Sequence, residues 1–162
     1  MPEPMHPTAE QLILTVSGML DGSRPHEILI DDVLAASGVS RSSVYHHFGD
    51  YQGLIEATLL RRFAVNVDAD AKAMEQVVGD ATSKEEYWMR LRKLSAATQT
   101  PQRASVRAER ARILALASSN ERFGKALSVE QDRLTDAMAT AITHAQDKGW
   151  VKPELNARAI AV

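Results

Sequence analysis

Apolar residues recur every three or four positions along most of the chain, which is the pattern of amphipathic helices. Between residues 8 and 20 this stripe consists of Leu12, Ile13, Val16, Met19 and Leu20. Similar stripes predict helices over residues 30–37, 41–47, 51–78, 84–99, 102–118 and 120–148, with a last helix from residue 154 onward. The pattern therefore predicts an all-α fold.

Polar residues mark several of the predicted helix starts. Thr8 with Gln11, and Ser83 with Glu86, fit the capping box, in which two side chains each accept a bond from an otherwise unpaired backbone N–H. Thr100 is the expected cap of the helix over 102–118. Within these helices we expect the buried positions to include Trp88, Leu91, Leu94, Val106, Ile113, Leu116 and Ala117.

A tight turn separates two of the shortest predicted helices. Gly38 is suited to the left-handed conformation that ends a helix within one residue. Val39 then fills the corner and the Ser40 hydroxyl caps the next helix. Two short helices joined by such a turn form the helix-turn-helix geometry.

The helix over 41–47 is polar on one side. Val44 and Phe48 lie four residues apart and are expected to face inward. The outward side then carries hydrogen-bonding groups without negative charge: Arg41, Ser42, Ser43, Tyr45, His46 and His47. Such groups are suited to base edges and phosphates. An ordinary solvated helix face is the other interpretation, and the pattern alone leaves both open.

Composition narrows the class of protein. The chain has 162 residues, 44% of them hydrophobic, and no cysteine, so disulfides and thiolate chemistry are excluded. No apolar run approaches the roughly 20 residues of a membrane span, and the N-terminus lacks signal-peptide character. The net charge of −2 is unevenly spread: residues 1–50 hold two arginines against seven acidic residues, whereas residues 84–125 hold ten basic residues against four acidic ones.

Other charged groups give weaker signals. Asp31 and Asp32 suit the first turn of a helix, where carboxylates favour the positive end of the helix dipole. The arginines at 103, 107 and 110 line one helix side, either as a solvated basic face or as partners for an anionic effector or for interdomain carboxylates. His46 and His47 are adjacent, so they do not share a metal from one helix face. We find no metal-ligand spacing and expect neither a metal nor a cofactor.

These motifs resemble those of a known family. Ser37-Gly38-Val39-Ser40, then Val44-Tyr45-His46-His47-Phe48, then Leu54-Ile55, is similar to the N-terminal domain of TetR-type (tetracycline-repressor-like) transcriptional regulators. The match covers about residues 8–60. The resemblance implies a three-helix helix-turn-helix domain over 1–50. A long fourth helix would join it to an antiparallel helical bundle over 51–162 that binds an effector and dimerises.

The resemblance also implies roles for particular residues. Arg41, Ser42 and Ser43 would approach bases in the major groove, while Tyr45 with His46 or His47 would contact phosphates. The full set of expected DNA contacts is Ile30, Ser40, Arg41, Ser42, Ser43, Tyr45, His46, His47 and Tyr51. The expected effector pocket contains Phe63, Val67, Trp88, Arg110 and Met138. These pocket residues suit a helical core equally well.

Three positions are notable when the chain is compared with the family pattern. Leu29 stands where a serine or threonine usually caps the second helix, and Tyr51 stands where a lysine usually begins the fourth. Ser42 occupies the position after the recognition-helix arginine, which is often a small residue. Together with the acidic balance of residues 1–50, the first two departures predict weak nonspecific DNA binding with a shallow salt dependence.

The resulting hypothesis is a cytoplasmic regulator, nucleoid-associated when bound to DNA, and not an enzyme. We expect a homodimeric repressor that binds a near-palindromic double-stranded operator and is released by a small-molecule effector. One alternative is a helix-turn-helix protein that has lost DNA binding and acts as a ligand-sensing or protein-interaction module; another is an all-helical enzyme. The final helix has no cap, and family members generally continue further. We therefore expect either a truncated chain or an atypical dimer.

Overall fold

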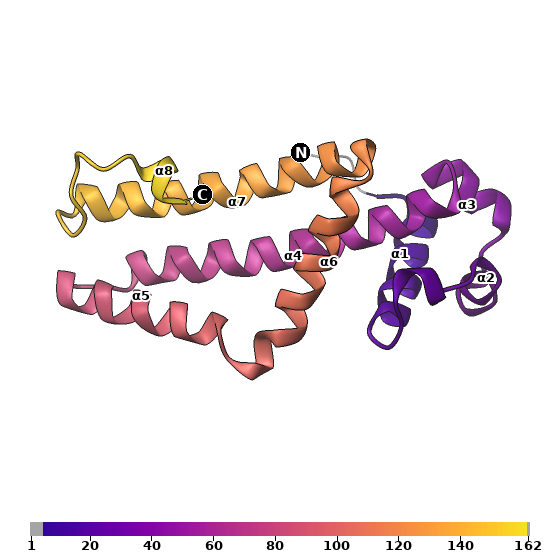
Figure 1. The fold of residues 1–162 in the computed structure, drawn as a ribbon, viewed down its shortest axis with the longest axis horizontal. Coiled ribbons are helices and arrows are strands. Elements are labelled where there is room, and N and C mark those ends of the chain that lie inside the picture. Colours follow the sequence, from indigo (N-terminus) through magenta and orange to yellow (C-terminus); the bar gives the residue numbers. More distant parts are fainter. Residues whose placement is uncertain (1–4, 162) are drawn as a thin grey trace. The chain divides into compact units, whose positions relative to one another are not determined.

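The computed structural model describes residues 5–161, and this part of the chain is helical without strands, as predicted (Figure 1). It divides into two compact units, Met1–Arg62 and Phe63–Val162, whose boundary falls inside one long helix. In chain order the elements are α1 (Pro7–Leu20), the 3₁₀ turn η1 (Pro25–Glu27), α2 (Ile30–Ser37), α3 (Arg41–Phe48), α4 (Tyr51–Gly79), α5 (Lys84–Thr98), the 3₁₀ turn η2 (Pro101–Arg103), α6 (Ala104–Ser118), α7 (Glu121–Asp147) and α8 (Ala157–Ala161).

Four helices supply the core of the first unit. Leu12 and Val16 of α1, Val33 of α2, Val44 of α3 and Leu54 of α4 are all completely buried. Each belongs to an apolar stripe or to the inward side expected from the sequence. Burying a side chain of this size contributes about 1.5–3 kcal/mol, so these contacts fix the three short helices against the start of α4.

The start of α1 differs from the prediction. His6, not Thr8, is the N-cap, because the backbone N–H of Thr8 donates to Nδ1 of His6 at 3.2 Å. Pro7 occupies the first helical position, where its missing N–H costs nothing, and this moves the helix start ahead of Thr8. The amide of Gln11 donates instead to the carbonyl of Ser37 at 2.7 Å, which ties α1 to the end of α2.

The turn between α2 and α3 forms as predicted. Gly38 adopts φ of 68°, and its N–H donates to the carbonyl of Leu34 at 2.9 Å. Ser40 then caps α3 by accepting from the N–H of Ser43 at 3.3 Å. This left-handed residue directs the chain from α2 into α3 through a turn of three residues.

The junction between α3 and α4 depends on a close approach that the sequence pattern did not reveal. Asp50 accepts a hydrogen bond from the N–H of Gly53 at 2.5 Å and so satisfies the first turn of α4. Gly53 itself is pressed against the carbonyl oxygen of Phe48, and a Cβ at this position would collide with that oxygen. Only glycine fits here without a backbone shift.

The second unit has its own hydrophobic core, to which α4, α5 and α7 contribute. Its buried residues are Met74, Val77, Val78, Ala81, Tyr87, Ala141 and Ala145. Tyr87 is 1% exposed, with its ring centroid 5.6 Å from that of Trp150. Leu91 and Leu94 pack against this cluster as expected, whereas Trp88 is 39% exposed. The expectation for Trp88 was wrong because Tyr87, four residues before Leu91, lies on the inward stripe and Trp88 lies beside it.

The capping box at α5 is half formed. The Ser83 hydroxyl accepts from the N–H of Glu86 at 3.2 Å, as predicted. The Glu86 carboxylate turns instead to Thr82, accepting from its N–H at 2.9 Å and its hydroxyl at 2.8 Å, and pairs with Arg90 at 2.8 Å. These bonds, led by the two from Thr82, lower the pKa of Glu86 to about 2.

Burial and end positions in α6 and α8 also depart in part from the predictions. Ile113 is buried, but Val106, Leu116 and Ala117 are only half-buried. Thr100 makes no cap bond, since its hydroxyl donates to the carbonyl of Ala97. The last helix begins at Ala157 instead of residue 154. Among the described residues no helix is long and apolar enough to cross a membrane.

Candidate nucleic-acid interface

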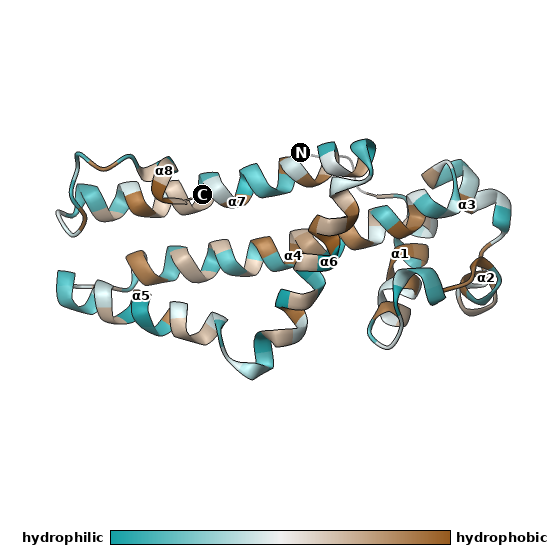
Figure 2. Cartoon of the chain, in the orientation of Figure 1, coloured by the Kyte–Doolittle hydropathy of each residue, from teal (hydrophilic) through white to brown (hydrophobic). Residues whose placement is uncertain are grey.

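The outward side of α3 is the polar side expected from the sequence. Val44 is fully buried, whereas Arg41, Ser42, Tyr45 and His46 are exposed and Ser43 and His47 are half-buried. In Figure 2 α3 carries mostly teal and pale residues, while brown residues are prominent in α1. The turn at Gly38 and the Ser40 cap at the start of α3 thus present one row of uncharged and basic groups to solvent.

Three hydroxyls gather at the N-terminal end of this helix. The Oγ of Ser40 lies 2.9 Å from Oγ of Ser42 and 2.9 Å from Oγ of Ser43. Hydroxyls both donate and accept, so this group is suited to either a base edge or a phosphate oxygen. Its place at a helix N-terminus adds backbone N–H groups and the positive end of the dipole, which favour anions.

Arg41 is the permanent cation on α3, and it is already paired. Its Nη2 donates to Oδ1 of Asp31 at 2.5 Å, an ion pair that links α3 to the first turn of α2. The two side chains are 50% and 81% exposed, so the pair lies in solvent and contributes little to stability. Asp31 was expected to interact with the helix dipole in the first turn of α2, and its bond to Arg41 was not foreseen.

A cluster of three imidazoles lies at the other end of the surface. The ring of His6 stacks on that of His47 with centroids 4.9 Å apart, and His46 meets His47 edge-on at 4.8 Å. Partial burial, followed by the neighbouring His46 and His6, lowers the pKa of His47 below its usual 6.5. His6 was absent from the predicted site, since nothing in its local sequence indicates that its ring reaches α3.

The other expected DNA contacts lie beside α3. Tyr51 donates its hydroxyl proton to the carbonyl of Ile28 at 2.7 Å, and burial, with Asp32 nearby, raises its pKa. It therefore stays neutral, where the family pattern has a cation. Ile30 is half-buried as the first residue of α2, and Leu29 precedes it without a side-chain cap bond.

The residues expected to line an effector pocket differ in their burial and contacts within the second unit. Phe63 and Val67 are 4% and 1% exposed, and Met138 packs against the core of the second unit. The Arg110 guanidinium lies 5.7 Å from the centre of the Phe63 ring, a cation–π contact. Trp88 is exposed.

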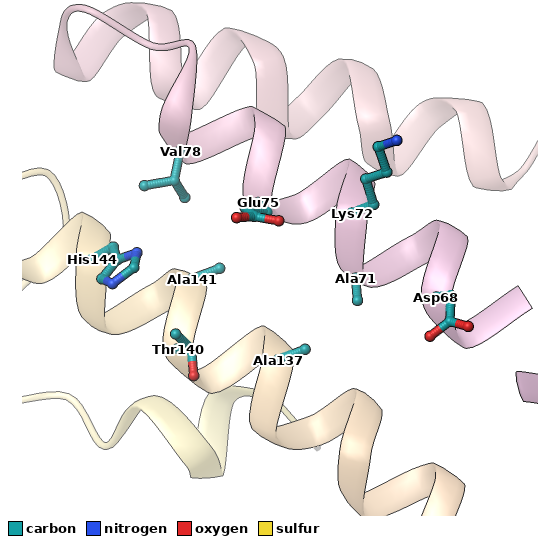
Figure 3. A pocket seen from close by; sticks show the side chains of 9 residues that line it. All are labelled: Asp68, Ala71, Lys72, Glu75, Val78, Ala137, Thr140, Ala141 and His144. Atoms are coloured by element: carbon teal, nitrogen blue, oxygen red, sulfur yellow. The ribbon is translucent and has the colours of Figure 1, made fainter. Parts of the chain in front are cut away.

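A groove of about 470 Å³ lies between α4 and α7 (Figure 3). Figure 3 shows Ala137 and Ala141 of α7 pointing toward the α4 side, while Lys72 extends away from α7. The lining residues are Asp68, Ala71, Lys72, Glu75, Val78, Ala137, Thr140, Ala141 and His144. Small side chains leave the space, and none of the five predicted pocket residues lines it.

Two of the three arginines singled out in the sequence share one carboxylate. Nη2 of Arg103 and Nη2 of Arg110 lie 2.9 Å and 2.7 Å from the two oxygens of Asp70 on α4. Arg107 donates to the carbonyls of Thr98 and Thr100. This row is therefore engaged within the second unit, and its partners are a carboxylate and backbone carbonyls.

Comparison with solved structures supports the fold. A protein described as a TetR-family transcriptional regulator from Rhodococcus sp. is similar with a TM-score of 0.63 and 21% identity, over 96% of this chain and 79% of that one. FadR, a fatty acid degradation regulator from Bacillus halodurans, is similar with a TM-score of 0.62 and 16% identity, over 98% of this chain and 79% of that one. No protein-family profile and no curated sequence matches the chain.

These similarities define the class of fold. The chain has the all-helical fold of TetR-type regulators, with the short helices α1, α2 and α3 preceding a long α4. The resemblance first indicated by the turn at Gly38 and the residues that follow is confirmed at the level of the fold.

Proposed function

We propose that the protein is a DNA-binding transcriptional regulator. The observation that carries this proposal is the outward face of α3: Arg41, a group of serine hydroxyls and Tyr45 stand exposed beyond a tight glycine turn. These are the groups that hydrogen-bond base edges and phosphates in a major groove. A TetR-type fold, in which this helix follows the turn, supports the same conclusion.

The DNA complex would use two copies of the chain. In a homodimer, two α3 helices enter successive major grooves about 34–36 Å apart, so the operator is near-palindromic. Arg41, Ser42 and Ser43 read bases, while Tyr45, His46 and His47 contact phosphates. Ser40, Ile30 and Tyr51 complete the expected interface, with Tyr51 supplying contact area and a hydroxyl oxygen in place of a positive charge.

Regulation is assigned to the second unit. The helix α4 runs without interruption from the first unit into the second, so a small molecule bound among α4, α6 and α7 would act on the DNA-binding residues through that helix. Two regions are proposed for effector binding. One is the groove between α4 and α7, and the other is the set Phe63, Val67, Trp88, Arg110 and Met138. We propose a repressor: because effector and DNA binding are coupled reciprocally, an effector that weakens DNA binding releases the protein from its operator.

The test begins with DNA selection. The full chain is incubated with a randomised duplex pool, and bound sequences are amplified until a consensus emerges; anisotropy titrations then compare this operator with a random duplex. Arg41→Ala is expected to weaken operator binding about 10–100-fold, since a base contact by arginine contributes about 1–3 kcal/mol. Arg61→Ala, which removes an exposed arginine from α4, is the matched control and should leave the ratio of operator to random affinity unchanged.

A second candidate is a helix-turn-helix protein that no longer binds DNA and serves as an interaction or sensing module. It is favoured by the pairing of Arg41 with Asp31, by the neutral Tyr51 and by the acidic balance of residues 1–50. Absence of any selected consensus, with Arg41→Ala indistinguishable from the unmodified chain, would establish this candidate over the regulator.

A further inference from the structure

The ion pair between Arg41 and Asp31 lies in the middle of the proposed DNA interface. Asp31 belongs to the first turn of α2 and Arg41 to the first residue of α3, and their 2.5 Å contact spans the turn at Gly38. Both side chains are exposed, so the pair is not needed to neutralise a buried charge. Its position therefore calls for another explanation than stability.

Positive charge is scarce in this unit. Residues 1–62 contain four arginines and no lysine. Of these, Arg62 is engaged by the carbonyl of Ser17 and the carboxylate of Asp21, and Arg41 is the one on α3. A carboxylate placed on that guanidinium removes most of the net positive charge that α3 would offer to a phosphate.

We infer that Asp31 is a specificity-determining residue: it holds Arg41 in position for one base pair and suppresses its attraction to phosphates. This inference rests on the proposed function and assigns a role within the same interface. Asp31 acts on DNA only through Arg41, so it is a positioning residue.

The geometry of the guanidinium permits both tasks at once. An arginine side chain has five N–H donors arranged in a planar fork. Oδ1 of Asp31 accepts from Nη2 of Arg41, while the hydrogens on Nε and Nη1 and the second hydrogen on Nη2 remain outside this contact. Two of these can donate in parallel to O6 and N7 of a guanine, the commonest specific contact of arginine. The carboxylate then limits the rotamers of Arg41 before DNA arrives.

The Asp31 carboxylate also weakens nonspecific binding to DNA. In a nonspecific encounter, affinity comes from phosphates neutralised by cations, and each one steepens the salt dependence by about 0.9 in the logarithmic slope. Asp31 offsets the charge of Arg41 and repels the phosphate that would approach it. The acceptors of guanine carry no formal charge, so Asp31 repels them less than it repels a phosphate. Discrimination between operator and random DNA therefore increases.

The experiment compares Asp31→Asn with Asp32→Asn. Both changes remove one negative charge from the same exposed turn, and among the described contacts Asp31 bonds Arg41 whereas Asp32 does not. Binding of the full chain to the selected operator and to a random duplex is measured by anisotropy over a series of KCl concentrations. Circular dichroism melting confirms that each variant is folded.

Asp31→Asn should bind the random duplex several-fold more tightly, with a salt slope steeper by about 0.9. Its operator-to-random ratio should fall about tenfold, the value of one good base contact. Asp32→Asn should shift both affinities equally and keep the ratio. In an Arg41→Gln background, Asp31→Asn should behave as Asp32→Asn does.

Two results overturn the inference in different ways. An operator that is selected and bound, with equal ratios for Asp31→Asn and Asp32→Asn, refutes the role of Asp31 and leaves the regulator intact. Failure of the unmodified chain to select any operator refutes the proposed function, and the inference falls with it.

Discussion

The first unit gathers its candidate site on one short helix, α3, whereas the second unit forms its groove between α4 and α7, which are separated in the chain by α5 and α6. On α3 the turn at Gly38 and the Ser40 cap, both made by near neighbours in sequence, determine which side chains face outward. In the groove the space exists because small residues of two distant helices face each other. The two units thus differ in whether local or long-range contacts create the surface that is offered to a partner.

The largest expected effect tests the long-range packing of the second unit. Tyr87→Ala removes a side chain that is 1% exposed and packs beside Trp150, so it should lower the free energy of unfolding by about 3–5 kcal/mol. Urea unfolding followed by tryptophan fluorescence measures this, because Trp88 and Trp150 both lie in the second unit. Met89→Ala, on the same helix but 56% exposed, should stay within about 0.5 kcal/mol; equal losses would contradict the packing described.

The next effect tests the local geometry of the first unit. Gly53→Ala places a Cβ against the carbonyl of Phe48 and should destabilise this unit by about 1–3 kcal/mol through overpacking. Amide exchange of α3 and α4 residues reports the loss. Gly18→Ala is the control, since nothing lies within 4 Å of its Cβ, and it should stabilise α1 by about 0.5–1 kcal/mol. An unchanged stability in Gly53→Ala would show that the backbone at the junction of α3 and α4 can shift to accommodate the Cβ.

A smaller effect concerns the carboxylate shared by two arginines. Asp70→Asn leaves Arg103 and Arg110 without their charged partner, and because Asp70 is 20% exposed the cost is expected to be about 1–2 kcal/mol. Urea unfolding by tryptophan fluorescence again measures it. Asp80→Asn removes a looser pair with Arg90, at 3.7 Å and largely exposed, and should cost at most about 0.5 kcal/mol. A larger loss of stability in Asp80→Asn than in Asp70→Asn would show that the ion pairs of Asp70 do not stabilise the fold.

The smallest expected effect is a pH dependence of stability that differs between the two units. The pKa of His47 is lowered in the folded chain, so the unfolded state binds more protons and the first unit loses stability as pH falls through 6.5. The pKa of Glu86 is about 2, so its contribution is complete above 4.5 and is lost as pH falls toward 2. Unfolding midpoints are measured over a range of pH. Their dependence on pH should become weaker near 6.5 in His47→Gln and below 4.5 in Glu86→Gln. Unchanged profiles would contradict these assignments.

Sequence patterns determined the parts of the fold that depend on near neighbours. The starts of α2, α3 and α4, the left-handed Gly38 and the Ser40 cap are set within a few residues and were all predicted. Contacts across the chain were not: neither the stacking of His6 on His47 nor the bond between Asp31 and Arg41 leaves a periodic signal. Trp88 shows the same limit on a smaller scale, because an aromatic pair at 87 and 88 does not reveal which ring faces the core.

The position of His6 has a practical consequence for purification and assay. Its ring lies against His47, so a polyhistidine tag fused ahead of residue 1 would add imidazoles only a few positions in sequence from a ring of the proposed interface. Such imidazoles would compete with His6 for contact with His47. At acidic pH they would also add positive charge that the protein itself does not carry. A removable fusion at the other end of the chain avoids confusing a property of the vector with a property of the protein.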